Sequence, residues 1–152
     1  MKALQFLAVV LTALALVPDG AHLLALPAKM ALDETSYLTV QAIYRGWSLL
    51  GFIPVAALAA DLSLAIGARR QPGPARLALG AALCQAATLV VFFLWTYPAN
   101  QATADWTGSS QAWLALRGQW EYSHAANAGL TFVALCLAVA SSLCWRREYQ
   151  QA

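Results

Sequence analysis

The sequence predicts an all-α membrane protein, a bundle of four transmembrane helices that run up, down, up and down. Of its 152 residues, 61% are hydrophobic and only 11% are charged. Globular domains in water carry roughly 25% charged residues, so the composition argues against a soluble domain. Four long apolar runs supply one span each, and the short connections between them favour antiparallel neighbours. At this length one domain is expected, covering residues 1–152.

The first span is predicted at about residues 3–28, longer than the roughly 20 residues that cross a bilayer. Pro18-Asp19-Gly20 lies near its far end. A missing backbone donor followed by a glycine predicts a kink or a break there. The region after the apolar run lacks a small-x-small cleavage pattern, so we expect a retained span rather than a signal peptide.

The other three spans follow in order along the chain. Pro54 should kink the second span, whose first part is amphipathic. The third span should stop at Pro98, and the fourth should begin near Ser110, a favourable N-cap residue. These spans are predicted at about residues 36–67, 76–97 and 111–145.

The charges outside the spans predict the orientation. Basic residues dominate one end and acidic residues the other: Lys2, Arg69, Arg70, Arg76, Arg146 and Arg147 against Asp33, Glu34 and Asp105, with Lys29 beside them. The positive-inside rule then places both termini in the cytoplasm, as in a multi-pass protein of the cell membrane. The lipid bilayer is the expected partner; nothing indicates nucleic acid, and the sequence defines no protein partner.

Polar side chains gather at the outer end of all four predicted spans. They are Asp19 and His22 on the first span, Gln41 and Arg45 on the second, Asn100 just after the third, and Arg117, Glu121, His124 and Asn127 on the fourth. At about 100° per residue, the last four share one helical face. The inner half carries only Asp61, Gln85 and scattered hydroxyls. Polar groups are costly in a bilayer, so this convergence predicts one polar pocket near the non-cytoplasmic face.

One interpretation of this site is a metal centre. Asp19 with His22, and Glu121 with His124, both have the carboxylate-x-x-His spacing that puts two ligands on one helical face. Imidazole and carboxylate suit several divalent metals. Four-helix di-iron proteins also take carboxylates from their other two helices, and the second and third spans supply none at this level. The metal-free interpretation is therefore preferred, and no cofactor is expected.

In the metal-free interpretation the site performs acid–base chemistry. His124, with His22 as a second candidate, would act as the general base. Arg45 and Arg117 would stabilise a developing oxyanion, and either could pair with Glu121. Asn100 and Asn127 would orient a substrate. Tryptophans at the same level would line a pocket for an aromatic molecule: Trp47, Trp95 and Trp120, with Trp106 and Trp113 beside them.

The same residues also admit a structural interpretation. Tryptophan and arginine anchor helices at membrane interfaces, and Arg–Glu pairs tie transmembrane helices together. The protein would then be a non-enzymatic membrane subunit or a small-molecule-binding protein. The convergence of four helices on one level favours a site over this alternative.

Four segments follow one another as in a known family: His22-Leu23-Leu24-Ala25-Leu26-Pro27-Ala28-Lys29-Met30, Tyr44-Arg45-Gly46-Trp47, Trp95-Thr96-Tyr97-Pro98-Ala99-Asn100 and, after Trp113, Leu116-Arg117-Gly118-Gln119-Trp120-Glu121-Tyr122-Ser123-His124-Ala125-Ala126-Asn127. Over nearly its whole length the chain resembles the anthrone-oxygenase-like family of small four-helix membrane proteins, most of which are known only as a domain of unknown function. The resemblance implies a four-helix fold. It also implies, from a few fungal relatives, oxidation of polyketide anthrones to anthraquinones without metal or flavin. We therefore expect a cofactor-independent oxygenase that acts on a lipophilic aromatic substrate.

Overall fold

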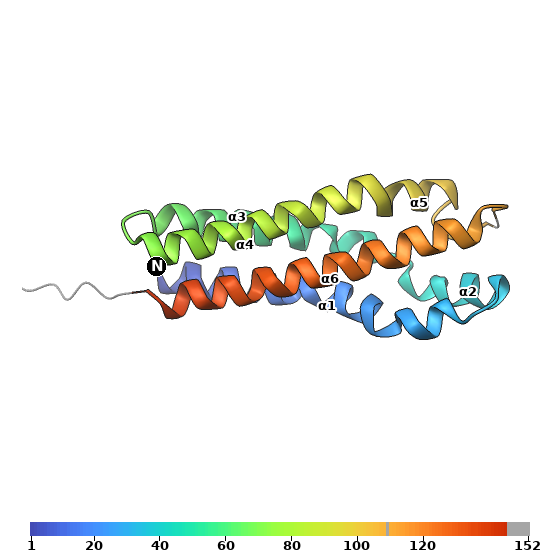
Figure 1. The fold of residues 1–152 in the computed structure, drawn as a ribbon, viewed down its shortest axis with the longest axis horizontal. Helices are drawn as coiled ribbons and strands as arrows, with labels where there is room; N and C mark the ends of the chain where they lie inside the picture. Colours follow the sequence, from blue (N-terminus) through green and yellow to red (C-terminus); the bar gives the residue numbers. More distant parts are fainter. Residues whose placement is uncertain (109, 146–152) are drawn as a thin grey trace, which may run out of the picture.

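Four helical segments in the computed structural model, which describes residues 1–108 and 110–145, are long and apolar enough to cross a membrane (Figure 1). They are Lys2–Met30, Trp47–Gly67, Pro72–Ala102 and Trp113–Leu143. Each packs against the next along the chain, and the last packs back against the first, which closes the ring. This arrangement confirms the predicted all-α bundle of four antiparallel membrane helices.

The first span is one continuous helix, α1 (Lys2–Met30), with Pro18 and Pro27 inside it. Of the kink or break predicted at residues 18–20, the break does not occur. A proline removes only its own backbone hydrogen bond, and α1 packs along its length against α6 (Trp113–Leu143). Because α1 continues to Met30, Lys29 belongs to the helix rather than to the following loop.

The segment predicted as the second span is divided, and only its later part crosses the membrane. Gly46 adopts φ +88°, a left-handed conformation that suits glycine and interrupts the helical path. Pro54 lies in the first turn of α3, where a missing N–H costs no α-helical hydrogen bond, so the predicted kink has no cause there. The elements are α2 (Glu34–Gln41), the 3-10 turns η1 (Ala42–Tyr44) and η2 (Trp47–Gly51), and α3 (Phe52–Gly67).

Asp33 sets the start of α2. Its Oδ1 accepts a hydrogen bond of 2.9 Å from the Ser36 amide, and Ser36 Oγ donates to Oδ2 at 3.0 Å. This is the usual geometry of an N-cap aspartate. The two bonds hold the pKa of the Asp33 carboxyl below its ordinary value, because they stabilise the charged form.

The third span runs further than predicted. It consists of α4 (Pro72–Val91), a π-helical turn η3 (Phe92–Thr96) and α5 (Tyr97–Ala102). The wide turn precedes Pro98, whose ring would crowd the carbonyl four residues earlier in a regular α-helix. The chain therefore passes Pro98 and carries Asn100 on a helical turn.

Small residues line the contacts between the helices. Ala8, Ala60 and Ala78 pack together with Leu64, and a second cluster joins α4 to α6 through alanines: Ala81, Ala134 and Ala138. Small side chains let helices approach closely where lipid supplies no hydrophobic drive for their association. Large apolar side chains instead face outward, as Leu24 does with 84% of its surface exposed.

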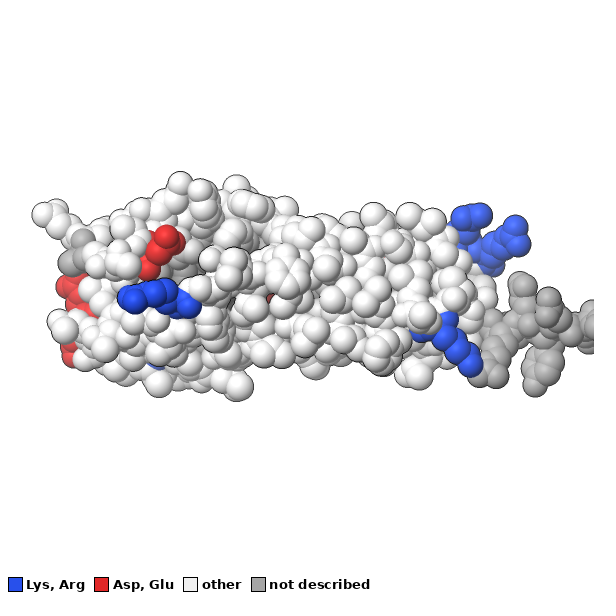
Figure 2. Space-filling model, turned by 180° about the vertical axis from the view of Figure 1, so that it is seen from behind, with Lys and Arg blue, Asp and Glu red and all other residues white. Residues whose placement is uncertain are grey.

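The two ends of the bundle differ in charge. The start of α1, the α3–α4 connection and the end of α6 lie at one end, and α2 lies at the other (Figure 1). In Figure 2, basic side chains gather at the first end, and most acidic side chains lie at the second, where a basic side chain is exposed beside them. The connection to α4 and its first turns supply Arg69, Arg70 and Arg76, and α2, its N-cap and the loop after α5 supply Glu34, Asp33 and Asp105. Arg146 and Arg147 lie outside the described residues. The cytoplasmic placement of the first end stays a prediction, and "inner" and "outer" are used below in that sense.

Candidate functional site

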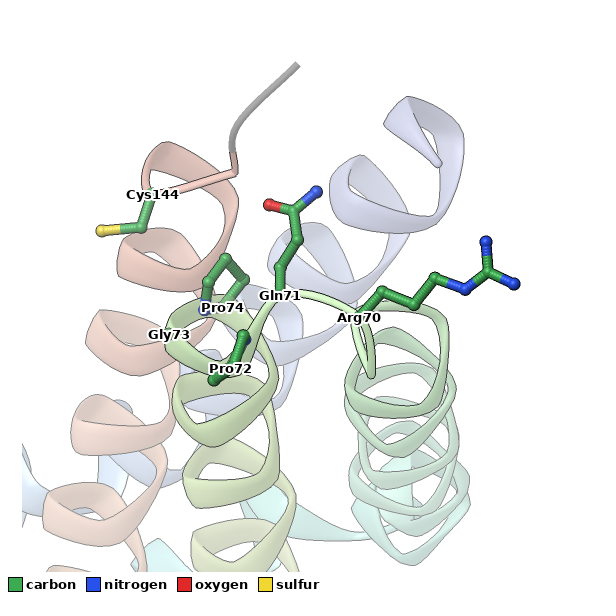
Figure 3. A pocket seen from close by; sticks show the side chains of 6 residues that line it. All are labelled: Arg70, Gln71, Pro72, Gly73, Pro74 and Cys144. Carbon is green, nitrogen blue, oxygen red and sulfur yellow. The ribbon is translucent and has the colours of Figure 1, made fainter. Parts of the chain in front are cut away.

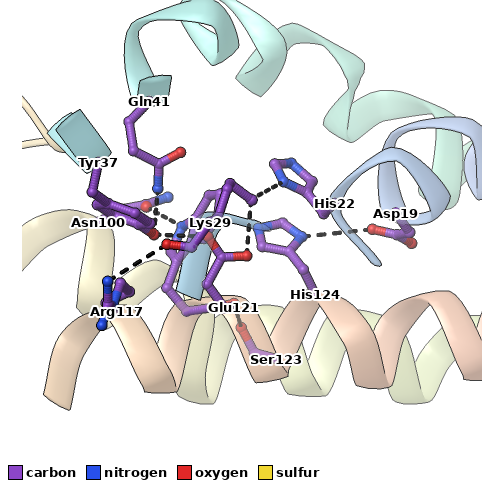
Figure 4. A network of polar contacts seen from close by, with 11 residues as sticks. Asp19, His22, Lys29, Tyr37, Gln41, Asn100, Arg117, Glu121, Ser123 and His124 are labelled. Carbon is purple, nitrogen blue, oxygen red and sulfur yellow. Dashed lines mark hydrogen bonds and ion pairs between the residues drawn. The ribbon is translucent and has the colours of Figure 1, made fainter. Parts of the chain in front are cut away.

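An ion pair between Lys29 and Glu121 is the centre of the polar cluster (Figure 4). Lys29 Nζ lies 2.8 Å from Glu121 Oε2, and the two side chains are 3% and 0% exposed. Tyr37 donates its hydroxyl to Glu121 Oε1 at 2.9 Å, and Gln41 Nε2 donates to the Tyr37 hydroxyl oxygen at 2.6 Å. The cluster thus ties α1 and α6 to α2. The predicted pairing of Glu121 with Arg45 or Arg117 is wrong, because Lys29 takes the carboxylate.

Burial raises the pKa values of the two tyrosines that enter this region from residues 34–46. For Tyr37 the nearby Glu121 carboxylate adds to the effect of burial, and the same two causes act on Tyr44. Both phenols therefore stay protonated. Tyr37 consequently acts as a hydrogen-bond donor to Glu121.

His22 lies in an aromatic enclosure and is 4% exposed. Its ring centroid is 4.2 Å from that of Tyr44, 4.8 Å from Trp120 and 5.6 Å from Trp47. Lys29 Nζ lies 3.3 Å from His22 Nδ1. An ammonium has no acceptor, so Nδ1 must carry the lone pair and Nε2 the proton. His22 is thus a neutral imidazole held in one tautomer.

His124 stacks on His22, with ring centroids 4.1 Å apart and an interplanar angle of 27°. Its Nδ1 lies 3.7 Å from Asp19 Oδ1, and the two side chains are 14% and 19% exposed. Thr131 Oγ1 donates to the other carboxylate oxygen of Asp19 at 3.3 Å. His124 is therefore a partly accessible imidazole beside a positioned carboxylate.

The two predicted arginines differ from each other in the structure. Arg117 is buried, donates to the Leu32 carbonyl at 2.8 Å, and stacks over Trp113 at 4.6 Å. It fixes the connection between α1 and α2. Arg45 is exposed and stands outside the contacts drawn in Figure 4, because the chain turns at Gly46 instead of continuing as a helix.

The two asparagines also have different surroundings. Asn100 Oδ1 accepts the indole N–H of Trp120 at 2.7 Å and that of Trp106 at 3.2 Å. Both hydrogen bonds use the side-chain oxygen of Asn100, so this oxygen is occupied by protein groups. Asn127 is 5% exposed, and its Oδ1 has no hydrogen-bond partner among the described residues.

The tryptophans divide in a similar way. Trp120 is buried and touches both histidines, and Trp47 contacts His22. Trp106 follows two other residues with positive φ, a left-handed turn that directs its ring into the core against Tyr37 and Trp120. Trp95 is 48% exposed and lies away from these contacts, as expected of a side chain at the lipid boundary.

Sequence reasoning missed two central residues, Lys29 and Tyr37. Lys29 stands seven residues after His22, a spacing that keeps both on one helical face. Tyr37 stands four residues before Gln41 and shares its face. Both signals depend on helix boundaries that the polar run after Pro27 had obscured.

A metal centre gains no support from the geometry. Across residues 1–108 and 110–145, no group of three His, Cys, Asp or Glu side chains is placed to hold an ion. Glu121 is occupied by Lys29 and Tyr37, and the histidines face each other ring to ring. The set Asp19, His22, Glu121 and His124 thus does not converge on one point.

A cavity of about 440 Å³ lies at the opposite, inner end of the bundle (Figure 3). It is lined by Arg70, Gln71, Pro72, Gly73, Pro74 and Cys144. None of the predicted site residues contributes to it.

Comparison with models of known protein families, with curated proteins and with solved structures found no match. The fold and the buried polar cluster define the class directly: a multi-pass membrane protein of four helices. The relation to anthrone oxygenases stays a prediction from the sequence.

Proposed function

We propose that this membrane protein is an enzyme in which His124 acts as a general base on a lipophilic aromatic substrate, in an oxidation by dioxygen that needs no cofactor. The proposal rests on the arrangement of Asp19, His124 and His22. An imidazole with partial access lies 3.7 Å from a carboxylate and 4.1 Å, ring to ring, from a neutral imidazole. A general base needs reach to the substrate and a group that stabilises its protonated form, and here Asp19 would supply the second.

The proposed reaction balances without a metal or flavin. His124 takes a proton from an acidic CH₂ carbon between aromatic rings, and the resulting carbanion reduces dioxygen. A C–O bond forms to give a peroxide anion, which takes the proton back from His124 to become a hydroperoxide and then loses water. The net change is CH₂ plus O₂ to C=O plus H₂O. Lys29, which lies beside His22 and pairs with Glu121, would share its charge with a developing oxyanion, in place of Arg45 and Arg117.

The aromatic side chains support a flat substrate. Trp120 and Trp47 meet His22 edge to face, at 4.8 Å and 5.6 Å between centroids. Offset and edge-to-face contacts are the favoured arrangements between aromatic rings. A lipophilic tricyclic molecule would reach this level from the bilayer. Asn127 would accept a hydrogen bond from it through its unpaired Oδ1.

The alternative is a non-enzymatic subunit or a binding protein, and one observation favours it. Most polar groups in the outer part of the cluster bind other protein groups: Glu121 binds Lys29 and Tyr37, Arg117 binds the Leu32 carbonyl, and Asn100 binds two indoles. These contacts lock helices together and leave little for a ligand. A substitution of His124 therefore distinguishes the two hypotheses, because the contacts that hold the helices together do not include His124.

The test is oxygen consumption by the purified protein in lipid nanodiscs, with anthrone as the probe. His124→Gln keeps a polar side chain of similar size but removes the base, and Arg45→Gln is the matched control on the exposed surface. We expect turnover in the wild type and the control, loss in His124→Gln, and the same melting temperature in all three. Undiminished turnover in His124→Gln, or no oxygen consumption and no binding of anthrone by the wild type, would refute the proposal.

A further inference from the structure

Polar residues follow one face of α1 from its inner end to its outer end. Counting from Gln5, they recur at intervals of seven, seven, three and seven residues: Gln5, Thr12, Asp19, His22 and Lys29. Seven residues are close to two helical turns, so these side chains stay on one face. At 1.5 Å per residue the stripe covers about 36 Å, more than the ~30 Å hydrocarbon core.

The other helices contribute polar groups that meet this stripe. Thr12 donates to Asp61 Oδ2 of α3 at 3.1 Å, and both residues are 0% exposed. Thr131 of α6 donates to Asp19. Gln85 of α4 is buried inside the bundle as well, with 0% of its surface exposed, but no contact joins it to the stripe. The stripe is therefore a polar column inside the bundle, and it is enclosed by apolar residues that face lipid.

The outer half of the column is continuous through short contacts. From Thr131 it passes to Asp19 at 3.3 Å and then to His124 at 3.7 Å. The stacked rings lead to His22, which contacts Lys29 at 3.3 Å, and Lys29 pairs with Glu121 at 2.8 Å. Most side chains in this series of contacts carry exchangeable protons or a titratable group.

The inner half contains buried polar atoms without a hydrogen-bond partner among the described residues. They are Gln5 Nε2, Asp61 Oδ1 and both side-chain polar atoms of Gln85. Unpaired buried atoms also occur in the outer cluster, at Gln41 Oε1 and Arg117 Nε. Unsatisfied groups of this kind are sites where buried water makes its hydrogen bonds. Chains of acidic and histidine residues inside transmembrane bundles mark proton relays.

We propose that this column is a proton path across the bundle, in which Asp61, Asp19 and His124 accept and release the proton and buried water joins the inner groups. One proton enters at the inner end for each proton that leaves at the outer end, and no bond to carbon changes. The flow is passive and follows the electrochemical gradient. The proposal requires no substrate. It shares Asp19 and His124 with the oxidation proposed above, whereas Asp61 belongs to the column alone.

The test uses liposomes of phosphatidylcholine and phosphatidylglycerol that enclose a pH-sensitive dye. A potassium gradient with valinomycin drives protons inward, and the rate of acidification is measured. Asp61→Asn keeps an oxygen that can accept from Thr12 but cannot release a proton. Asp105→Asn, in the outer loop, removes the same charge outside the column and is the matched control.

We expect the wild type and Asp105→Asn to acidify the liposomes faster than protein-free liposomes, and Asp61→Asn to fall to the protein-free rate with an unchanged melting temperature. A wild-type rate equal to that of protein-free liposomes would overturn the path. So would an Asp61→Asn rate equal to the wild type. If Asp61→Asn does not fold, Asp19→Asn takes its place with the same two decisive outcomes.

Discussion

Lys29 of α1 and Glu121 of α6 form a buried ion pair, with 2.8 Å between Nζ and Oε2. The two helices lie far apart in the sequence and are brought together by the packing of the bundle. Lys29 also lies over the rings of Tyr44 and Trp120, at 5.0 Å and 4.9 Å from their centroids. A buried charge is tolerated when it is paired and its remaining hydrogen-bonding groups are satisfied. The stability of the outer bundle should therefore depend on both partners together.

Removing one partner of this pair should destabilise the protein strongly. Lys29→Met leaves the Glu121 carboxylate buried without its cation, and breaking such a pair typically costs about 3–5 kcal/mol. The double variant Lys29→Met/Glu121→Gln should recover part of this loss, because no uncompensated charge remains. The free energy of unfolding in detergent measures both effects, with Lys2→Met as the exposed control. A single variant as stable as the wild type would show that the pair is not maintained.

The two arginines predicted as equivalent should differ in their effect on stability. Arg117→Met leaves the Leu32 carbonyl without its donor, at a cost of about 1–3 kcal/mol, and also removes the contact with Trp113. Arg45→Met changes an exposed side chain and should stay within about 0.5 kcal/mol of the wild type. Unfolding in detergent compares them directly. Equal losses for the two variants would contradict the assigned positions.

Asn100 should control the environment of two tryptophans. Asn100→Leu removes the acceptor of both indole N–H groups, and each unsatisfied donor costs about 1–3 kcal/mol. We expect lower stability and a shift in tryptophan fluorescence. Asn100→Asp keeps an acceptor oxygen and should retain more of the wild-type spectrum.

The neighbouring Gln101→Ala variant is the control for that experiment. Gln101 is exposed and only donates to the Tyr97 hydroxyl at 3.1 Å. Its removal should leave the fluorescence of Trp106 and Trp120 unchanged. A spectrum that responds equally to both substitutions would mean that the two indoles do not share the Asn100 carbonyl.

The helices were predictable because apolar length is a direct physical requirement of the bilayer. Their ends were not, because a bundle can override a local breaker. Pro18 and Pro98 were expected to interrupt or end helices, yet the chain continues past both. At Pro98 a π-helical turn absorbs the steric conflict, which residue patterns do not report.

The residue types of the site were predictable, but their pairing was not. Arg117, Glu121, His124 and Asn127 share a face of α6, as the helical period required. Which cation reaches Glu121 depended on whether Lys29 lies in a helix or in a loop. Arg45 was expected in the cluster only while residues 36–67 were treated as one helix, and Gly46 with its left-handed conformation turns it away.

At the outer end of the bundle, the side formed by residues 34–51 is built differently from the other three. Three helices there belong to long spans, whereas the fourth side consists of the short helix α2, which carries Tyr37 and Gln41, and two 3-10 turns, which carry Tyr44 and Trp47. Substitutions on this side can reshape the surroundings of His22 while the membrane-spanning frame stays intact. Under the function proposed above, substitutions that alter ligand preference are therefore expected to concentrate in this segment, while the rest of the bundle stays constant.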